Sequence, residues 1–251
     1  MYGWINDCIE KLVVEKFGIE KWHAIKEKAG VDVPDGCWVR LQVYDDGCTV
    51  DLVMAAADIL GVGSDVVLEL FGQYFIHFVK GEGYSNLLFC QGDNLKSWLN
   101  NINDLHLHLE NTLPEIVAPE FWCVDDPTTL GAVILRYRSK RGSLLAPLVV
   151  GLVKEVAVMY FNVNVDFTLL HLQDDELENK FTEWRITVSA EQSEDFDGDF
   201  HFALIQSNVD RYKRRSTKQT RGCPFHAMMV NILTQTYMHT YMFTYLFSCS
   251  I

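Results

Sequence analysis

The sequence predicts an α+β fold, in which a helical N-terminal part is followed by a part built of antiparallel strands and packed helices. Two observations support this prediction. Through most of the first 113 residues, apolar residues recur at spacings of three and four, the period of an amphipathic helix. Beyond Pro119 the period changes to two, which is typical of a half-buried strand. With 251 residues, 49% of them hydrophobic, the chain is long enough to bury a substantial core.

Helices are expected throughout the N-terminal part. The first places Ile5, Ile9 and Leu12 on one face and stops at Gly18, a residue that commonly follows the end of a helix. Ser64 is a suitable N-cap for the fourth. The five expected helices span residues 2–17, 19–29, 51–61, 64–81 and 94–113.

The C-terminal part has the expected order strand, helix, strand, strand. Residues 143–161 are too long and too evenly apolar for a strand, so they predict a buried helix. The strands are expected at residues 131–138, 163–173 and 181–190.

Charge and composition narrow the possible functions. The net charge of −13 is uneven, because residues 211–251 hold six Lys or Arg and no acidic residue; subtracting them leaves −19 on residues 1–210. Such an acidic body disfavours nucleic acids and anionic membranes. The N-terminus lacks a basic segment followed by an apolar block, so we expect a cytoplasmic protein. The seven cysteines show no zinc-binding spacing and are expected to be reduced.

Two histidines in the fifth expected helix fall on different faces. At 100° per residue, His106 lies on the apolar stripe with Leu109 and Leu113, whereas His108 lies nearer the polar side. An inward histidine is most often a core residue bonded to a carbonyl, but neutral imidazole is also a common metal ligand. A third possibility is an enzyme in which His106 or His108 acts as a general base beside Asp104 or Glu110, although no Ser or Cys nucleophile motif accompanies them.

A second polar group lies at the end of the first expected strand. Alternation sends Tyr137, Ser139 and Arg141 to one face, and all three are hydrogen-bond donors. A guanidinium flanked by two hydroxyls suits a buried carboxylate, because arginine offers paired, charge-assisted hydrogen bonds. An ordinary polar strand end would have the same pattern.

Short motifs along the chain occur in a distinctive order. They are MYG at the start, FGQYF at 71–75, LHLHL at 105–109, AP at 118–119, YRSKR at 137–141 and LAPLVVGL at 145–152. Together they resemble an H-NOX domain, the haem nitric oxide/oxygen binding module of soluble guanylate cyclase and of bacterial sensors. The resemblance covers about residues 1–190 and implies a haem b buried between the helical part and the strand-containing part.

The resemblance also implies roles for individual residues. His106 matches the proximal iron ligand and the only protein ligand, and Pro119 matches a proline that presses on the porphyrin. The Tyr-Ser-Arg group matches the triad that holds the haem propionates. The residues expected to contact the haem on this side are His106, Pro119, Tyr137, Ser139, Arg141, Leu105 and Leu109. One departure is that the segment RGSLLAP, which begins at Arg141, holds one residue more than the family pattern.

Gas selectivity depends on the opposite side of the haem. The positions that match the oxygen-holding Tyr or Trp of oxygen-binding relatives are Leu148, Phe75 and Ile9, with Ile5 close by, and all are apolar. A pocket without a donor favours nitric oxide over oxygen. Tyr74 would overturn this prediction if its hydroxyl lay over the iron, but one residue along a helix turns the side chain by about 100°.

These features predict a haem-based nitric oxide sensor, the regulatory part of a soluble guanylate cyclase beta-like subunit. In the family, nitric oxide weakens the bond from iron to the proximal histidine and releases its helix, which here is 94–113. A cyclase alpha-like subunit or another signalling protein is the expected partner, and the chain itself is expected to have no cyclase activity. The alternatives are a haem-free interaction domain and an oxygen-binding H-NOX domain.

The C-terminal residues differ in character from the rest. Residues 191–221 are expected to be a charged linker. GCPFHAMMV at 222–230 resembles the opening of a PAS-like domain, after which a threefold tetrad begins at Thr236. We interpret 222–251 as a truncated start of that domain or a low-complexity tail. Its polar residues disfavour a membrane span, because they are costly in hydrocarbon.

Overall fold

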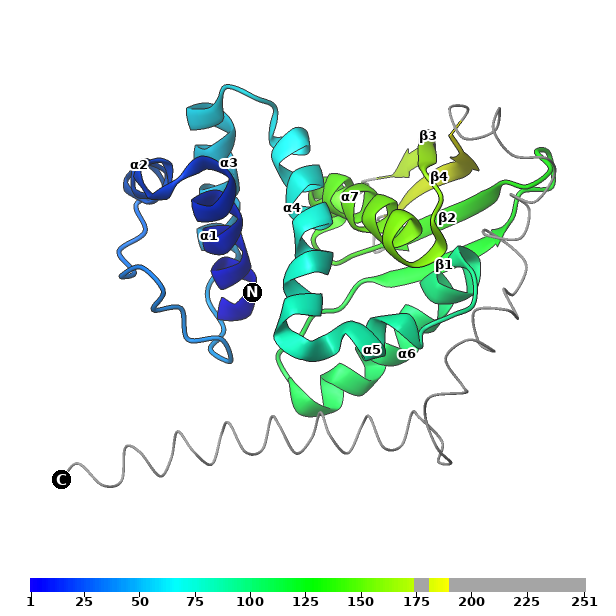
Figure 1. Ribbon diagram of the computed structural model, residues 1–251, viewed down its shortest axis with the longest axis horizontal. Coiled ribbons are helices and arrows are strands. Elements are labelled where there is room, and N and C mark those ends of the chain that lie inside the picture. Colours follow the sequence, from blue (N-terminus) through cyan, green and yellow to red (C-terminus); the bar gives the residue numbers. More distant parts are fainter. Residues whose placement is uncertain (174–180, 190–251) are drawn as a thin grey trace.

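The computed structural model describes residues 1–173 and 181–189 (Figure 1). It confirms an α+β architecture of helices and one antiparallel sheet. The helices are α1 (Gly3–Phe17), α2 (Ile19–Ala29), α3 (Asp46–Leu60), α4 (Ser64–Val79), α5 (Ser85–Phe89), α6 (Leu95–Thr112) and α7 (Ala146–Val156). The strands are β1 (Glu120–Asp125), β2 (Val133–Arg138), β3 (Val165–Gln173) and β4 (Phe181–Val188).

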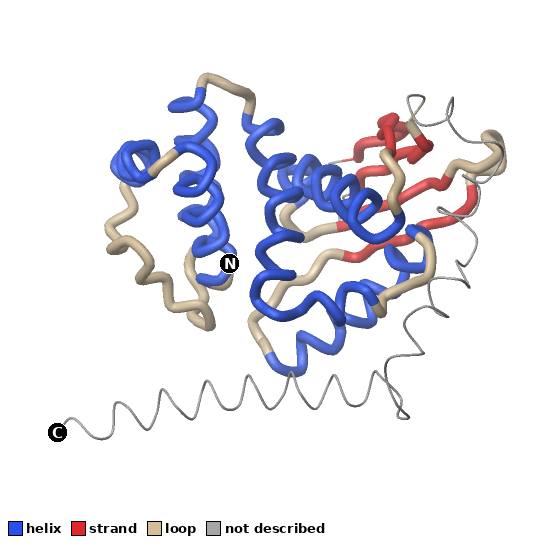
Figure 2. Tube along the Cα trace, in the orientation of Figure 1, coloured by secondary structure: helices blue, strands red, loops and turns tan. Residues whose placement is uncertain are grey.

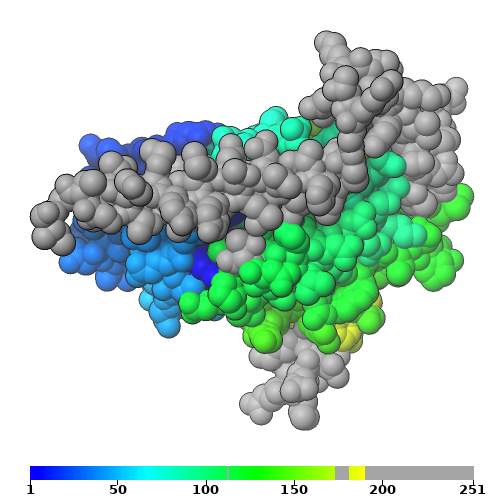
Figure 3. Space-filling view, turned by 90° about the horizontal axis from the view of Figure 1, so that it is seen from below, coloured from blue at the N-terminus to red at the C-terminus, as the bar shows by residue number. Residues whose placement is uncertain are grey.

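The N-terminal helices α1, α2 and α3 pack together and adjoin the rest of the molecule (Figures 1 and 3). Gly30 and Gly61 end α2 and α3 in the left-handed conformation that glycine adopts without strain. Helix α3 begins at Asp46, five residues before the expected start. The Asp45 side chain accepts a hydrogen bond of 2.7 Å from the Gly47 N–H, so a capping interaction starts the helix ahead of its apolar stripe.

The sheet has the order β1-β2-β4-β3, and all neighbouring strands are antiparallel. Strand β1 was not expected from the sequence. Its inward residues Phe121 and Cys123 are buried, but its outward residues Trp122 and Val124 are also apolar. Burial alternates along β1, but apolar and polar residue types do not, so the sequence lacks the period of two that would predict a strand.

Helix α4 lies between the N-terminal helices and α7, and α7 covers the sheet (Figure 2). Two glycines allow α4 and α7 to approach closely. A Cβ on Gly72 would lie 2.0 Å from the Leu148 carbonyl oxygen, and one on Gly151 would lie 1.9 Å from the Glu69 carbonyl oxygen. The backbones are thus in contact where the helices cross.

The apolar segment Gly142–Phe161 forms the helix that the sequence predicts over 143–161. By length and composition alone, these 20 residues are also sufficient to cross a membrane. Its inner side belongs to the core, because Val153, Val156 and Ala157 are fully buried. Packing of α7 against α4 and β3 accounts for its apolar composition.

Candidate functional site

Helix α6 is fastened along the free edge of β1 by two asparagine side chains. Asn100 donates from Nδ2 to the Cys123 carbonyl and accepts at Oδ1 from the Cys123 N–H, both at 2.9 Å. Asn103 does the same with Phe121, at 2.6 and 2.9 Å. Each amide thus replaces the backbone partner that a neighbouring strand would supply.

His106 continues this series, three residues after Asn103. Its Nδ1 lies 3.2 Å from the carbonyl oxygen of Pro119, two residues before Phe121. Because a carbonyl can only accept, Nδ1 carries the proton and Nε2 presents a lone pair. Burial lowers the pKa of His106, which favours the neutral ring that a metal requires.

This geometry gives the general-base alternative no support. The hydrogen-bond partner of His106 is a main-chain carbonyl, and both Asp104 and Glu110 are exposed. His108, two residues further along α6, faces a different direction, as the helical period predicts.

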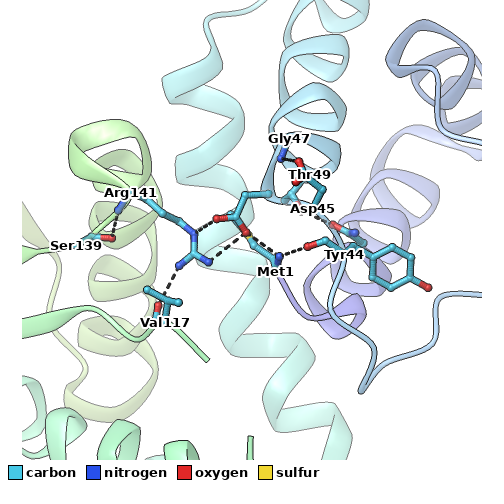
Figure 4. Close-up of polar contacts among 10 residues, drawn as sticks. Met1, Tyr44, Asp45, Gly47, Thr49, Val117, Ser139 and Arg141 are labelled. Carbon is cyan, nitrogen blue, oxygen red and sulfur yellow. Dashed lines mark hydrogen bonds and ion pairs between the residues drawn. The ribbon is translucent and has the colours of Figure 1, made fainter. Parts of the chain in front are cut away.

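The predicted polar group lies at the end of β2, with Tyr137 in the strand and with Ser139 and Arg141 just after it (Figure 4 shows the last two). Tyr137 is 2% exposed, and its ring lies between Phe121 and Trp184, with centroids at 5.5 and 6.3 Å. Burial raises the pKa of Tyr137, which keeps the phenol protonated, and its hydroxyl interacts with that of Ser139. The Ser139 Oγ in turn accepts a hydrogen bond of 3.1 Å from the Arg141 backbone N–H.

The Arg141 side chain joins distant segments (Figure 4). Its Nε and Nη2 donate to the two carboxylate oxygens of Asp46, at 2.7 and 3.2 Å. Its Nη1 donates to the Val117 carbonyl at 2.9 Å. Asp46 Oδ1 also accepts from the α-amino group of Met1 at 2.7 Å.

The apolar residues predicted on the other side come from three helices. Ile5 on α1, Phe75 on α4 and Leu148 on α7 are all half-buried against the core. Phe75 packs edge-on against Trp4 at 5.8 Å. They border the same hydrophobic core as Leu105 on α6. Leu105 and Leu109 are half-buried beside His106 on α6.

The Tyr74 hydroxyl has its own partner on α1. It donates a hydrogen bond of 2.8 Å to Glu15 Oε2 on α1, and this bond is exposed. Burial and the Glu15 carboxylate raise the pKa of Tyr74. The Tyr74 hydroxyl therefore already donates to α1. That the gas side of the haem has no hydrogen-bond donor stays a prediction.

Comparison with known families decides how this geometry is interpreted. The model of the haem-NO-binding family matches residues 2–169, about two-thirds of the chain. The chain belongs to this family. Its matched part is a sensor domain rather than a catalytic one, and it is related to the sensor domains of soluble guanylate cyclases.

Curated relatives of this H-NOX chain include "Soluble guanylate cyclase gcy-37" of Caenorhabditis elegans, 27% identical over 235 residues, or 93% of this chain and 31% of the relative. "Guanylate cyclase soluble subunit beta-2" of Rattus norvegicus is 32% identical over 111 residues, covering 44% of this chain and 16% of the relative. The chain spans about a third or less of the length of these relatives.

Solved structures with the same fold include an H-NOX protein from S. oneidensis in the Fe(II)NO state. It has a TM-score of 0.61 and 21% identity, and the match covers 75% of this chain and 99% of that one. The unliganded Fe(II) H-NOX protein from K. algicida gives 0.61 and 18%, with 75% and 97% covered. These likenesses confirm the H-NOX fold.

The residues present fit the haem that H-NOX domains bind. In the part of the chain that the structure describes, no three His, Cys, Asp or Glu side chains gather as a metal cluster. A haem brings four of the iron's ligands itself, so the Nε2 lone pair of His106 is enough protein ligation. Tyr137, Ser139 and Arg141 are donors suited to propionate carboxylates.

The structure adds residues that the sequence analysis missed. Asn100 and Asn103 share a face with His106, at spacings of three, and this polar series beside an apolar stripe was a usable signal. Asp46 and Val117 had no such signal. Asp46 lies 95 residues from Arg141 in sequence, and only the folded chain brings the start of α3 beside the segment after β2.

Replacing Asn103 with Leu is expected to destabilise the H-NOX domain. The change keeps the side-chain size but leaves the Phe121 N–H and carbonyl without partners, at a cost of about 2–3 kcal/mol. Urea unfolding measures this loss. Asn111→Leu is the matched control, because the Asn111 amide bonds within α6, to Leu107. Equal stabilities for the two variants would contradict the structural role of Asn103.

Proposed function

We propose that this H-NOX domain is a nitric oxide sensor that holds a haem b through His106. The observation that supports this most strongly is the Nδ1 contact of His106 with Pro119, which aims a neutral ring and its Nε2 lone pair away from the backbone. When bound, the haem supplies the ferrous iron that takes up the diatomic gas. Pro119, placed directly beside His106, is proposed to contact the porphyrin.

Tyr137, Ser139 and Arg141 are proposed to hold the propionates. Tyr137 and Ser139 are buried, and Arg141 is half-buried, so their hydrogen bonds to a carboxylate are partly shielded from water. Burial strengthens such charge-assisted bonds. Leu105 and Leu109, on the same helix as His106, are proposed to form the apolar wall beside the ring.

Selectivity for nitric oxide is proposed to come from Ile5, Ile9, Phe75 and Leu148. None of these side chains has a hydrogen-bond donor, and Tyr74, which has one, donates to Glu15. Bound oxygen needs a donor to stabilise the charge it draws from iron, whereas nitric oxide does not. An apolar group on the gas side therefore favours nitric oxide.

Signalling is proposed to pass through α6. Release of His106 would leave this helix tied to β1 by Asn100 and Asn103, which hold its N-terminal part. Movement would then be confined to the part after Asn103, which carries Leu107 with 63% of its surface exposed. A helix whose first half is tied to a strand and whose second half is held by one coordination bond is a two-state element.

The cellular location and the partner of this protein are proposed from its relatives. Their names describe soluble guanylate cyclases, which supports a cytoplasmic location and a cyclase alpha-like subunit or another signalling protein as partner. The charged linker at 191–221 and the PAS-like or low-complexity segment at 222–251 lie outside the described residues. We retain them as proposals, together with an H-NOX domain at 1–190.

The deciding experiment is the absorption spectrum of the reduced, purified protein alone, under air and with nitric oxide. We expect a Soret band that air leaves unchanged and nitric oxide shifts. A change under air that reverses when oxygen is removed would indicate an oxygen-binding H-NOX domain instead. No Soret band after expression with ample haem would indicate a haem-free interaction domain.

A further inference from the structure

Asp46 lies where four segments of the domain meet, one of them the N-terminus, whose α-amino group donates to Asp46 Oδ1 at 2.7 Å. Asp46 is the first residue of α3 in the N-terminal helices, while Arg141 follows β2 and Val117 belongs to the segment after α6 (Figure 4). The start of α3 is set by the neighbouring cap, Asp45, so the backbone that carries the Asp46 carboxylate is held in place. Asp46 thereby links the N-terminal helices to the guanidinium.

The contacts of Arg141 fix the plane of its guanidinium. Asp46 engages one edge through Nε and Nη2, and the Val117 carbonyl accepts from Nη1 on the other terminal nitrogen. A planar group held on two sides by partners from different segments cannot rotate without breaking a hydrogen bond. The guanidinium is partly shielded from water, since the Arg141 side chain is 20% exposed, whereas the Asp46 side chain is 46% exposed.

The N–H groups of Arg141 can be counted to find those that remain for a further acceptor. Arginine has five N–H groups. Within the described residues, Asp46 takes one on Nε and one on Nη2, and Val117 takes one on Nη1. One N–H therefore remains on each terminal nitrogen. A pair of N–H groups on the two terminal nitrogens is what a second carboxylate accepts in a paired contact.

We propose that Asp46 is a positioning residue of the haem site, whose carboxylate orients the Arg141 guanidinium so that its remaining N–H pair meets a haem propionate. This inference rests on the proposed function, because it requires the haem. It makes the N-terminal helices part of the propionate anchor, although Asp46 itself does not contact the haem. A shift of α3 relative to β2 would turn the guanidinium and weaken that anchor.

The test compares Asp46→Asn with Asp51→Asn, an equal loss of charge at an exposed position of the same helix. Each protein is loaded with haem, and the rate of haem transfer to an excess of a haem acceptor is measured. We expect about tenfold faster haem loss from Asp46→Asn, the size of change that follows from a weakened charge-assisted contact, and an unchanged rate from Asp51→Asn.

Haem dimethyl ester distinguishes a positioning role of Asp46 from a general effect on domain stability, because its esterified propionates carry no charge. With this ester, wild type and Asp46→Asn are expected to lose the ligand at equal rates. Equal acceleration with haem and ester would overturn the proposal, as would a rate equal to that of Asp51→Asn. Slower haem loss would also overturn it, because Asp46 would then compete with the propionate for Arg141.

Two further results keep the outcome interpretable. Should Asp46→Asn fail to fold, Asp46→Glu retains the charge and displaces the carboxylate by one methylene, and it is expected to show the same selective effect on haem but not on its ester. If the wild-type protein takes up no haem, the proposed function fails. If the wild-type protein takes up haem and the Asp46 variants lose it at the same rate as Asp51→Asn, only the proposed role of Asp46 is wrong.

Discussion

Replacing His106 with Gly is expected to remove haem from the purified protein, with retention weakened by more than about 100-fold. Loss of a residue that merely orients a metal ligand costs about 10–100-fold in metal affinity, so loss of the ligand itself should exceed that range. The physical reason is that His106 is the only proposed protein ligand, and the remaining contacts hold the propionates rather than the iron. The measurement is the ratio of Soret to protein absorbance.

His108→Gly is the matched control, because it places the same helix-weakening residue two positions away on another face of α6. It is expected to retain haem. Added imidazole should restore the Soret band of His106→Gly, since a free ligand can enter the space left by the ring. A His106→Gly protein that keeps its haem without imidazole would show that the iron ligand has been assigned to the wrong residue.

Replacing Gly72 with Ala is expected to destabilise the domain by about 3 kcal/mol, at the upper end of the usual cost of overpacking. The new Cβ would lie 2.0 Å from the Leu148 carbonyl oxygen, which is backbone and cannot rotate away. Helices α4 and α7 must therefore separate. For a domain of this size the loss corresponds to a melting temperature lower by about 6–12 °C, measured by circular dichroism.

Gly81→Ala provides the comparison for this variant, because a Cβ there meets nothing within 4 Å. It is expected to be neutral or slightly stabilising, since alanine restricts the unfolded chain. The Gly151→Ala variant faces a similar clash, with Glu69, at the same crossing. The double variant should cost less than the sum of the two, because separating the helices once relieves both clashes. Additive losses would contradict this shared origin.

The crossing of α4 and α7 also positions two of the apolar residues proposed for the gas side of the haem. Phe75 is three residues after Gly72 on α4, and Leu148 is the residue whose carbonyl Gly72 contacts. The closeness of the two backbones therefore sets how near these apolar side chains lie to one another. The same FGQYF and LAPLVVGL motifs that carried the family resemblance contain both glycines.

Local patterns in the sequence were sufficient for much of the fold. Helices α1, α2, α4, α6 and α7 and strands β2, β3 and β4 were predicted because each buries one face, and the periods of 3.6 and 2 record which residues face inward. The inward direction of His106 followed from the same geometry. The family resemblance rested on short motifs, and the haem-NO-binding match confirmed it.

Strand β1 and the capped start of α3 required the folded structure. The first is hidden because apolar residues occupy both of its faces, and the second because a side-chain cap rather than burial begins the helix. The attachment of α6 through Asn100 and Asn103 likewise depends on a strand edge whose position the sequence does not reveal.

The difference between what sequence and packing each determine is clearest at Arg141. Its side-chain type and its place after a strand were enough to suggest an anchor for a carboxylate. Its orientation is set by Asp46, 95 residues away, and by the Val117 carbonyl, 24 residues away. Periodicity reports which face of one element is buried, whereas hydrogen bonds between elements exist only once the chain has brought those elements together.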